Sequence, residues 1–103
     1  MQEMAYGIGT TVDLSPAEAE EKVREALAAE GFGILTEIDV QATMKAKLDI
    51  DGAPYKILGA CNPPLAHRAL TADQDIGMLR PCNGVVYASD EATVVSAIEP
   101  ALL

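Results

Sequence analysis

The pattern of apolar and polar positions predicts five β-strands. They cover residues 4–12, 33–39, 55–61, the stretch around 85–87, and 93–98. Residues 4–12 and 33–39 alternate with a period of two, which is typical of a strand with one buried face, and residues 93–98 are rich in β-branched side chains. Gly7 and Gly9 in the first segment indicate a bulge or a close approach of two backbones. A short polar turn at 89–92 separates the last two segments, so the pattern predicts that they form a hairpin.

The helices are indicated by their start and stop signals. Ser15, Pro16 and Glu18 form a capping box that predicts a helix over 16–30, and Gly31 is a natural stop. Residues 41–48 predict one short helix, followed by turn residues at 49–52. Asn62 and Pro63 predict the cap and first residue of a further helix that runs to about residue 73. Residues 75–77 are expected to form a loop.

This order of elements predicts the fold class. Strands outnumber helices, and the final pair is antiparallel, so we expect an α+β fold. The sheet would be mostly antiparallel with about five strands, two main helices would pack on one face, and a short helix would be added. The 103 residues correspond in length to one domain, 1–103, which is large enough to bury one hydrophobic core.

Charge narrows the possible partners. The formal net charge is -9, with seven Lys and Arg residues spread along the chain, so neither nucleic acid nor an anionic membrane surface is an expected partner. The apolar runs are too short to span a bilayer. The first residues lack the pattern of a signal peptide, which predicts a cytoplasmic location, where Cys61 and Cys82 would be reduced.

Cys61 is the main candidate for chemistry because it ends a predicted strand just before a capped helix. Unpaired N–H groups and the positive end of a helix dipole stabilise a thiolate and can also bind a small anion. The alternative is that Cys61 is a small buried hydrophobe, which is the commoner state of a cysteine. Cys82 would approach Cys61 if their strands are neighbours, which leaves a reversible redox pair possible.

His67, the single histidine, falls outside the apolar stripe of its predicted helix, so an exposed position is expected. It is nevertheless a candidate partner for a reactive Cys61. Cys61, His67 and Cys82 are zinc-ligand types, but the sequence has no Cys-x-x-Cys or His-x-x-x-His spacing, and we predict no metal site. No cofactor can be named from the sequence.

Several segments resemble the family known as domain of unknown function 302. The stretch 55–66, which reads Tyr-Lys-Ile-Leu-Gly-Ala-Cys-Asn-Pro-Pro-Leu-Ala, is similar to its signature. Segments 37–45, 75–79, 81–86 and 93–100 match in the same order, so the resemblance covers roughly residues 5–100. Gly84 departs from the family pattern at the entry to the fourth strand. The resemblance implies a fold of the TATA-binding-protein-like class, usually a homodimer, and no established activity.

Two functions are therefore expected to compete. The first is a homodimeric module that binds a small molecule or an anion in a cleft at the strand-to-helix corner, with ligand contacts from Cys61, Asn62, Pro63, Cys82 and Asn83. The second is a thiol-dependent enzyme or redox sensor that uses Cys61 with Cys82 or His67. In a third interpretation, the corner has only a structural role.

Overall fold

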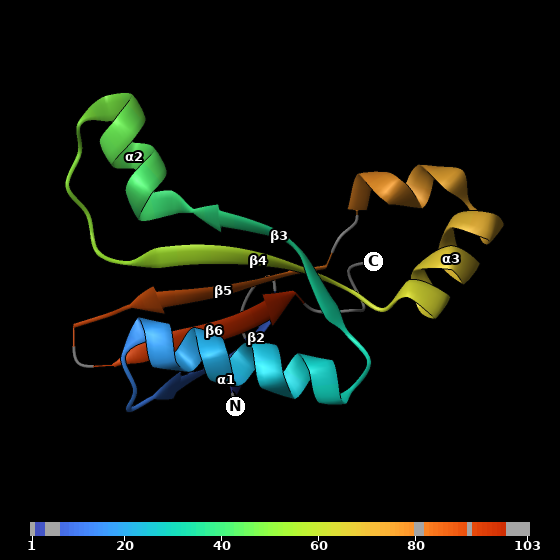
Figure 1. Cartoon of the computed structure of the whole chain (residues 1–103), viewed down its shortest axis with the longest axis horizontal. Coiled ribbons are helices and arrows are strands. Elements are labelled where there is room, and N and C mark those ends of the chain that lie inside the picture. Colours follow the sequence, from blue (N-terminus) through green and yellow to red (C-terminus); the bar gives the residue numbers. More distant parts are fainter. Residues whose placement is uncertain (1, 4–6, 80–81, 91, 99–103) are drawn as a thin grey trace.

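The computed structural model describes residues 2–3, 7–79, 82–90 and 92–98. Within these residues, six strands form one antiparallel sheet in the order β1-β2-β6-β5-β4-β3 (Figure 1). The α+β class is confirmed. The two-residue β1 was not predicted, because two residues are too few to show a period. The strands are β1 Gln2–Glu3, β2 Gly7–Val12, β3 Gly33–Asp39, β4 Tyr55–Cys61, β5 Cys82–Ala88 and β6 Thr93–Ile98.

Helix α1 (Pro16–Ala29) covers one face of the sheet, which we call the front face. Side chains alternate between the two faces along each strand, and paired residues share a face. Leu58 and Val86 therefore point forward and pack with Ala19 of α1, each of the three being at most 3% exposed. The hydrophobic core lies between α1 and the front face. The opposite, back face is formed by the alternate positions of the same strands.

Both ends of α1 follow the sequence signals. Ser15 Oγ accepts a hydrogen bond from Glu18 N at 3.2 Å, and Glu18 Oε1 accepts from the Ser15 backbone, so the predicted capping box is confirmed. At the other end, Gly31 has φ +83°, the left-handed conformation that glycine adopts most easily. Gly31 N donates to Ala28 O and Phe32 N donates to Leu27 O, which is the Schellman arrangement.

Two further helices flank the sheet. Helix α2 (Val40–Leu48) projects from the end of β3, and helix α3 (Pro63–Ala72) lies beyond the end of β4 (Figure 1). Asn62 caps α3 as predicted, since its Oδ1 accepts from Leu65 N at 3.3 Å. Of the two main helices expected on one face, α1 covers the front face, whereas α3 packs against the segment that follows it and not across the sheet.

One local expectation is corrected, and Gly84 is placed within a strand. The segment expected to be a loop at 75–77 lies within a short 3-10 helix, η1 (Gln74–Leu79), whose start is held by Asp75 N donating to Asp73 Oδ1. Gly84 does not shorten β5, because it pairs with Leu58 on one side and Ala97 on the other. Residues 4–6 of the first predicted strand lie outside the described residues, as do Pro81 and residues 99–100 of the segments that resemble the family.

Four charged side chains tie α1 to the edge of the sheet. Lys56 Nζ contacts Glu20 and Glu37, each at 2.9 Å, while Arg24 contacts the same two carboxylates at 2.9 and 2.6 Å. Each carboxylate therefore bridges one lysine and one arginine. The hydrogen bond from Lys56 lowers the pKa of Glu37, and the hydrogen bond to Glu37 raises the pKa of Lys56. This charge network links α1, β3 and β4.

Candidate functional site

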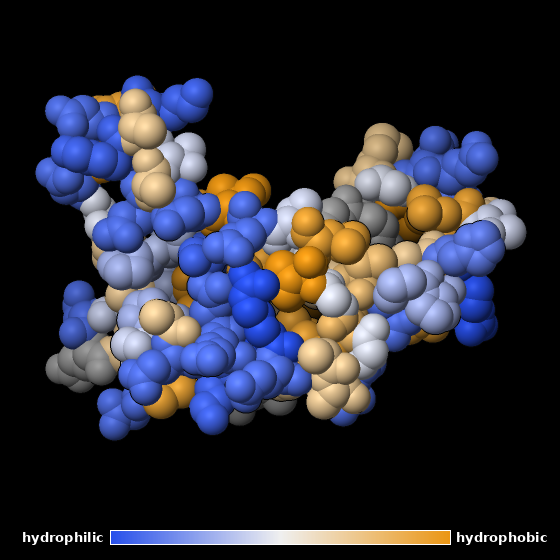
Figure 2. Space-filling model, in the orientation of Figure 1, coloured by the Kyte–Doolittle hydropathy of each residue, from blue (hydrophilic) through white to orange (hydrophobic). Residues whose placement is uncertain are grey.

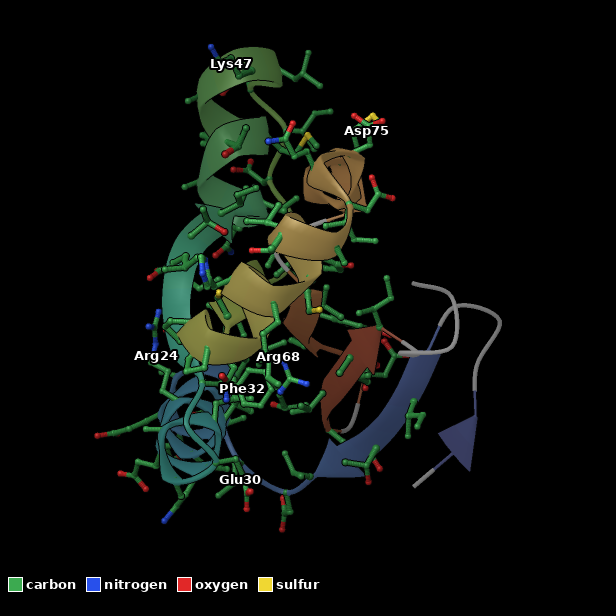
Figure 3. All side chains as sticks on the ribbon, turned by 90° about the vertical axis from the view of Figure 1, so that its right-hand side faces the viewer. Arg24, Glu30, Phe32, Lys47, Arg68 and Asp75 are labelled. Carbon is green, nitrogen blue, oxygen red and sulfur yellow. The ribbon has the colours of Figure 1, made fainter. Side chains whose placement is uncertain are left out.

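An apolar groove of about 760 Å³ lies at the corner where β4 leads into α3. Apolar surface gathers between the body of the molecule and α3 (Figure 2). Figure 3 looks onto this end of the molecule, with α3 across the front. The groove is lined by Leu27, Phe32, Leu35, Leu58, Ala60, Cys61, Asn62, Leu65, Ala66, Leu70, Cys82, Asn83, Gly84, Ala97 and Ile98.

The end of α1 builds one wall of the groove. The Schellman turn reverses the chain at Gly31, and Leu27 and Phe32, on either side of this turn, both line the groove. A hydrophobic contact between these two positions commonly accompanies the turn. Leu35 comes from β3, at a point where the pairing with β4 shifts by one residue between Ile34 and Thr36. Such a bulge re-aims a side chain, and Leu35 is 64% exposed.

Helix α3 builds the opposite wall with Leu65, Ala66 and Leu70. Its start lies close to the end of α1, since a β-carbon added to Gly31 would lie 3.1 Å from Asn62 Nδ2. Because Gly31 has no side chain, the Asn62 side chain that caps α3 has room beside the end of α1. The two walls meet at this contact.

The structure brings most of the predicted site residues together. Cys61, Asn62, Cys82 and Asn83 all line the groove. The other two candidates are not among the lining residues. Pro63 opens α3 beside the groove, and His67 is exposed on α3, as expected. The apolar walls from α1 and β3 were not predicted, because their approach to α3 depends on tertiary packing.

The groove has an uncharged lining. None of its lining residues is an acid, a base or a histidine, although the chain carries 16 acidic residues. Its polar lining residues are Asn62, Asn83, Cys61 and Cys82. Such a lining favours a ligand with a large apolar part and a few hydrogen-bonding groups.

The start of α3 has no N–H group available for an anion. Pro63 and Pro64 have no N–H, Leu65 N donates to the Asn62 side chain, and Ala66 N donates to Asn62 O. The donors that would bind an anion or stabilise a thiolate at Cys61 are therefore missing or already bonded. This geometry favours the small-molecule alternative over the anion.

The strand register separates the two cysteines. Cys82 pairs with Ala60, the residue before Cys61, so the two side chains point to opposite faces of the sheet. Both residues are half-buried thiols. Forming a disulfide between them would require the strand ends to rearrange, because the Cβ atoms of a disulfide must point toward one another. The register does not favour a redox pair.

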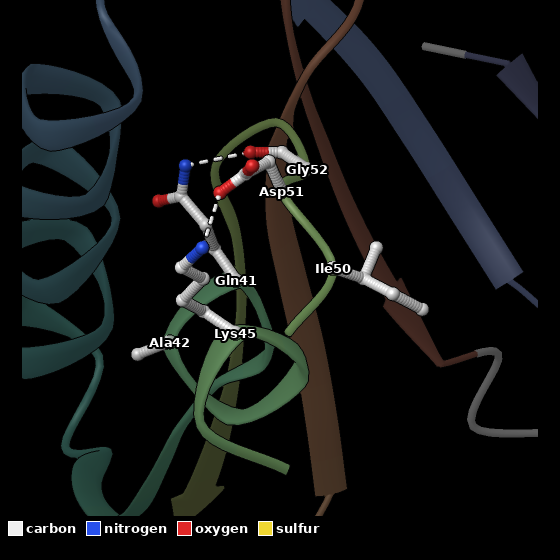
Figure 4. Close-up of a pocket in the computed structure, with 6 residues that line it drawn as sticks. All are labelled: Gln41, Ala42, Lys45, Ile50, Asp51 and Gly52. Atoms are coloured by element: carbon white, nitrogen blue, oxygen red, sulfur yellow. Dashed lines mark hydrogen bonds and ion pairs between the residues drawn. The ribbon is translucent and has the colours of Figure 1, made fainter. Parts of the chain in front are cut away.

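Two smaller hollows lie near α2, and their polar groups are used internally. One, of about 260 Å³, is shown in Figure 4. In it, Lys45 Nζ contacts Asp51 at 3.1 Å, and Gln41 Nε2 donates to Gly52 O at 2.7 Å. Lys45 Nζ also contacts Asp49, outside the lining, at 2.8 Å. The other, of about 310 Å³, lies beside the charge network and includes Glu20 and Lys56 in its lining. The charged groups of both hollows already have partners.

Among the described residues, no group of three or more His, Cys, Asp and Glu side chains is placed to hold a metal ion. In the part of the chain that the structure describes, no helix has the length and apolar character needed to cross a bilayer. The expected cytoplasmic location stays a prediction.

Comparisons with known proteins give a family and a fold. The model of the family described as "Domain of unknown function DUF302" matches residues 8–103. A crystal structure described as an uncharacterized conserved protein DUF302 from Bacillus stearothermophilus is 30% identical in sequence and superimposes with a TM-score of 0.88. The similarity covers 96% of this chain and 77% of that one. No curated protein matches the chain significantly.

Proposed function

Because the chain belongs to the family described as domain of unknown function DUF302, whose description assigns no activity, we propose a function from the geometry: the groove binds a small, uncharged, largely apolar molecule. The observation that carries this proposal is the uncharged lining of a groove of about 760 Å³. Pockets for small ligands commonly have volumes of about 300–1,000 Å³ and mostly apolar walls.

The polar groups of the lining orient the ligand. Asn62 and Asn83 each carry a side-chain amide with both donor and acceptor atoms, so they can recognise a hydroxyl, carbonyl or amide. Asn62 Oδ1 already accepts from Leu65 N, which leaves its NH₂ group as the donor toward the groove. An aliphatic body would contact Leu27, Leu65 and Leu70, while its polar end would meet these amides.

Two matched probes test this proposal. Decan-1-ol and decanoate have chains of equal length, but only decanoate is charged near neutral pH. A ligand that binds only the native state raises the apparent stability, by about 2.7 kcal/mol at a hundredfold excess over Kd. We expect decan-1-ol to raise the melting temperature more than decanoate, and uncharged Nile red to fluoresce on binding.

The control variants lie side by side on α3. Ala66→Trp places a large ring at a lining position, whereas His67→Trp places the same ring at an exposed neighbour outside the lining. Nile red binding should fall at least tenfold in the first variant and stay near the wild-type value in the second. Equal binding by both variants, or no response of the wild-type protein to either uncharged probe, would refute the proposal.

A second candidate function is supported by the presence of Cys61 and Cys82 in the same lining. In this alternative, a thiol-dependent enzyme or redox sensor uses Cys61 against a ligand held in the groove. The exposed position of His67 and the bonded N–H groups of α3 give this alternative less support. Fast alkylation of Cys61 with a midpoint below the ordinary thiol pKa of about 8.5 would favour it. Slow alkylation that Ala66→Trp slows further would instead mark Cys61 as a wall residue.

We propose further that the module acts as a homodimer, which the family resemblance implies. Large apolar side chains that are exposed in the single chain, among them Leu35 at 64% and Ile38 at 48%, support this proposal, because exposed apolar patches commonly mark interaction sites. Light scattering at micromolar concentration measures the mass directly. A mass equal to the chain mass of 10.8 kDa would contradict the dimer.

A further inference from the structure

The floor of the groove is formed by small side chains of the sheet. The four floor residues are Ala60 of β4, Cys82 and Gly84 of β5, and Ala97 of β6, and all of them line the groove. Because side chains alternate along a strand and paired residues share a face, all four lie on the same face as Leu58 of the core. The floor is therefore the part of the front face that continues beyond the core under α1.

Side-chain size falls from the core to the floor along two neighbouring strands. On the front face of β5, Val86 is preceded by Gly84 and Cys82, and on that of β6, Val95 is followed by Ala97. The two valines are paired, and they belong to the core or pack against it. Gly84 is half-buried and Ala97 is exposed, although both share the face of the core. The small residues therefore leave open a space that larger side chains would fill.

Gly84 is the floor residue for which the backbone gives no sufficient reason. Glycine weakens a strand, and it commonly marks a bulge or a place where another backbone or a ligand comes close. At Gly7 the reason is a backbone, since an added β-carbon would overlap Ala97 O. Gly84 is in no bulge, because it pairs regularly with both neighbouring strands. Apart from its chain neighbours, the one described atom within 4 Å of an added β-carbon is Ser96 O, at 3.3 Å, and a small shift relieves that contact. A ligand above the floor is the reason that remains.

The floor is also wide. It extends over β4, β5 and β6, so it spans two strand spacings, or about 10 Å. Contact with this whole width requires a body broader than one extended alkyl chain. A flat and rigid ring system meets this condition, and it loses less conformational freedom on binding than a flexible chain does. The volume of about 760 Å³ lies in the upper part of the usual range of about 300–1,000 Å³ for ligand pockets, which leaves room for such a body.

We propose that Gly84 is a specificity-determining residue of the groove and that the ligand is a flat, fused-ring molecule with one hydroxyl or carbonyl group. This inference rests on the proposed function, which it narrows to one class of uncharged, largely apolar ligand. One face of the rings lies on the floor, the leucines of the two walls contact their edges, and the oxygen accepts from the Asn62 NH₂ group. A side chain at Gly84 would lift the rings off the floor, whereas a flexible chain bends around it.

Two uncharged alcohols of different shape test this inference. Pyrenemethanol carries its hydroxyl on a flat fused-ring body, and decan-1-ol carries it on a single chain. Isothermal titration calorimetry measures the Kd of each, and we expect the wild-type protein to bind pyrenemethanol more tightly. Gly84→Val should weaken pyrenemethanol binding at least about tenfold and decan-1-ol binding less than about threefold, because one misplaced methylene in an apolar pocket already changes binding by about tenfold or more.

Gly33→Val is the matched control. Gly33 lies in β3 outside the lining, and a β-carbon added there meets no described atom within 4 Å. This variant should bind both alcohols as the wild-type protein does. Ala97→Val changes an exposed floor residue that is paired with Gly84, so it should show the same selective loss. If Gly84→Val does not fold, Ala97→Val against Gly33→Val decides the question.

The results separate this inference from the proposed function. Wild-type protein that binds decan-1-ol at least as tightly as pyrenemethanol overturns the fused-ring ligand and leaves the groove proposal intact. Equal losses for both alcohols in Gly84→Val and Ala97→Val, or no loss in either variant, overturn Gly84 as a specificity determinant. Absence of binding by both alcohols and by Nile red overturns the proposed function, and this inference with it.

Discussion

Replacing Gly31 with alanine tests the contact that joins the two walls of the groove. The residue has φ +83°, and an added β-carbon would lie 3.1 Å from Asn62 Nδ2. The substitution therefore strains the backbone at the end of α1. It also pushes against the side chain that caps α3. Both effects reach the groove, because Phe32 and Asn62 belong to its lining.

The expected magnitude follows from these two effects. A left-handed conformation costs a residue with a β-carbon about 1–2 kcal/mol. The contact with Asn62 is tight but involves a side chain that can move by a few tenths of an ångström, so it adds less. For a domain of this length, each 1 kcal/mol shifts the melting temperature by about 4–8 °C. We expect Gly31→Ala to melt roughly 5–15 °C below the wild-type protein.

Thermal unfolding followed by circular dichroism measures the effect, with Gly52→Ala as the matched control. A β-carbon at Gly52 meets no atom within 4 Å, and its φ is not positive, so that variant should be neutral or slightly more stable. Gly31→Asn separates strain from contact, because asparagine tolerates the left-handed region but keeps the β-carbon. A Gly31→Ala variant as stable as Gly52→Ala would refute the reasoning.

Three further substitutions follow from the same structure. Asn62→Ala should lower the free energy of unfolding, measured in urea, by about 0.5–2 kcal/mol, whereas Asn62→Ser, which keeps a capping oxygen, should lower it little. Equal decreases in the two variants would exclude the cap as the cause. Leu58 is 2% exposed, so Leu58→Ala should lower the free energy of unfolding by about 2–5 kcal/mol with an unchanged m-value. A decrease of less than about 1 kcal/mol would contradict the place of Leu58 in the core. The hydrogen bond from Lys56 lowers the pKa of Glu37 below its ordinary 4.5. The ionised Glu37 therefore stabilises the folded protein fully above pH 4.5, and this contribution is lost as the pH falls through the folded-state pKa. Lys56→Met should therefore flatten the dependence of melting temperature on pH below 4.5, and a slope equal to that of the wild-type protein would show that Glu37 is not coupled to Lys56.

Local signals were sufficient to predict most of the elements. Ser15 and Asn62 cap the helices that they were expected to cap, and β3, β4 and β6 begin and end at the predicted residues. These features depend on neighbours within a few positions of the chain. The 3-10 helix at 74–79 was missed because such a turn has no period of its own and is stabilised here by two short-range hydrogen bonds to Asp73.

The candidate site was predictable only in part. The corner at Cys61 and Asn62 could be located, because a strand that ends at a proline-initiated helix is a local pattern. The chemistry expected there rested on unpaired N–H groups, and two consecutive prolines followed by a capped Leu65 leave none. The walls from Phe32 and Leu35 depend on a Schellman turn and a bulge, whose effect appears only when the sheet is assembled.

The distribution of charge sets the groove apart from the rest of the surface. Acidic residues lie mainly on helices, turns and the β3 edge, where a carboxylate stays hydrated or meets a base as in the charge network. Burying an unpaired carboxylate costs several kcal/mol, so surfaces that are covered in the working protein must be free of such groups. The groove lining meets this condition among the described residues. A charge introduced at Leu65, in the α3 wall of the groove, should therefore weaken ligand binding, whereas the same charge at the exposed His67 outside the lining should not.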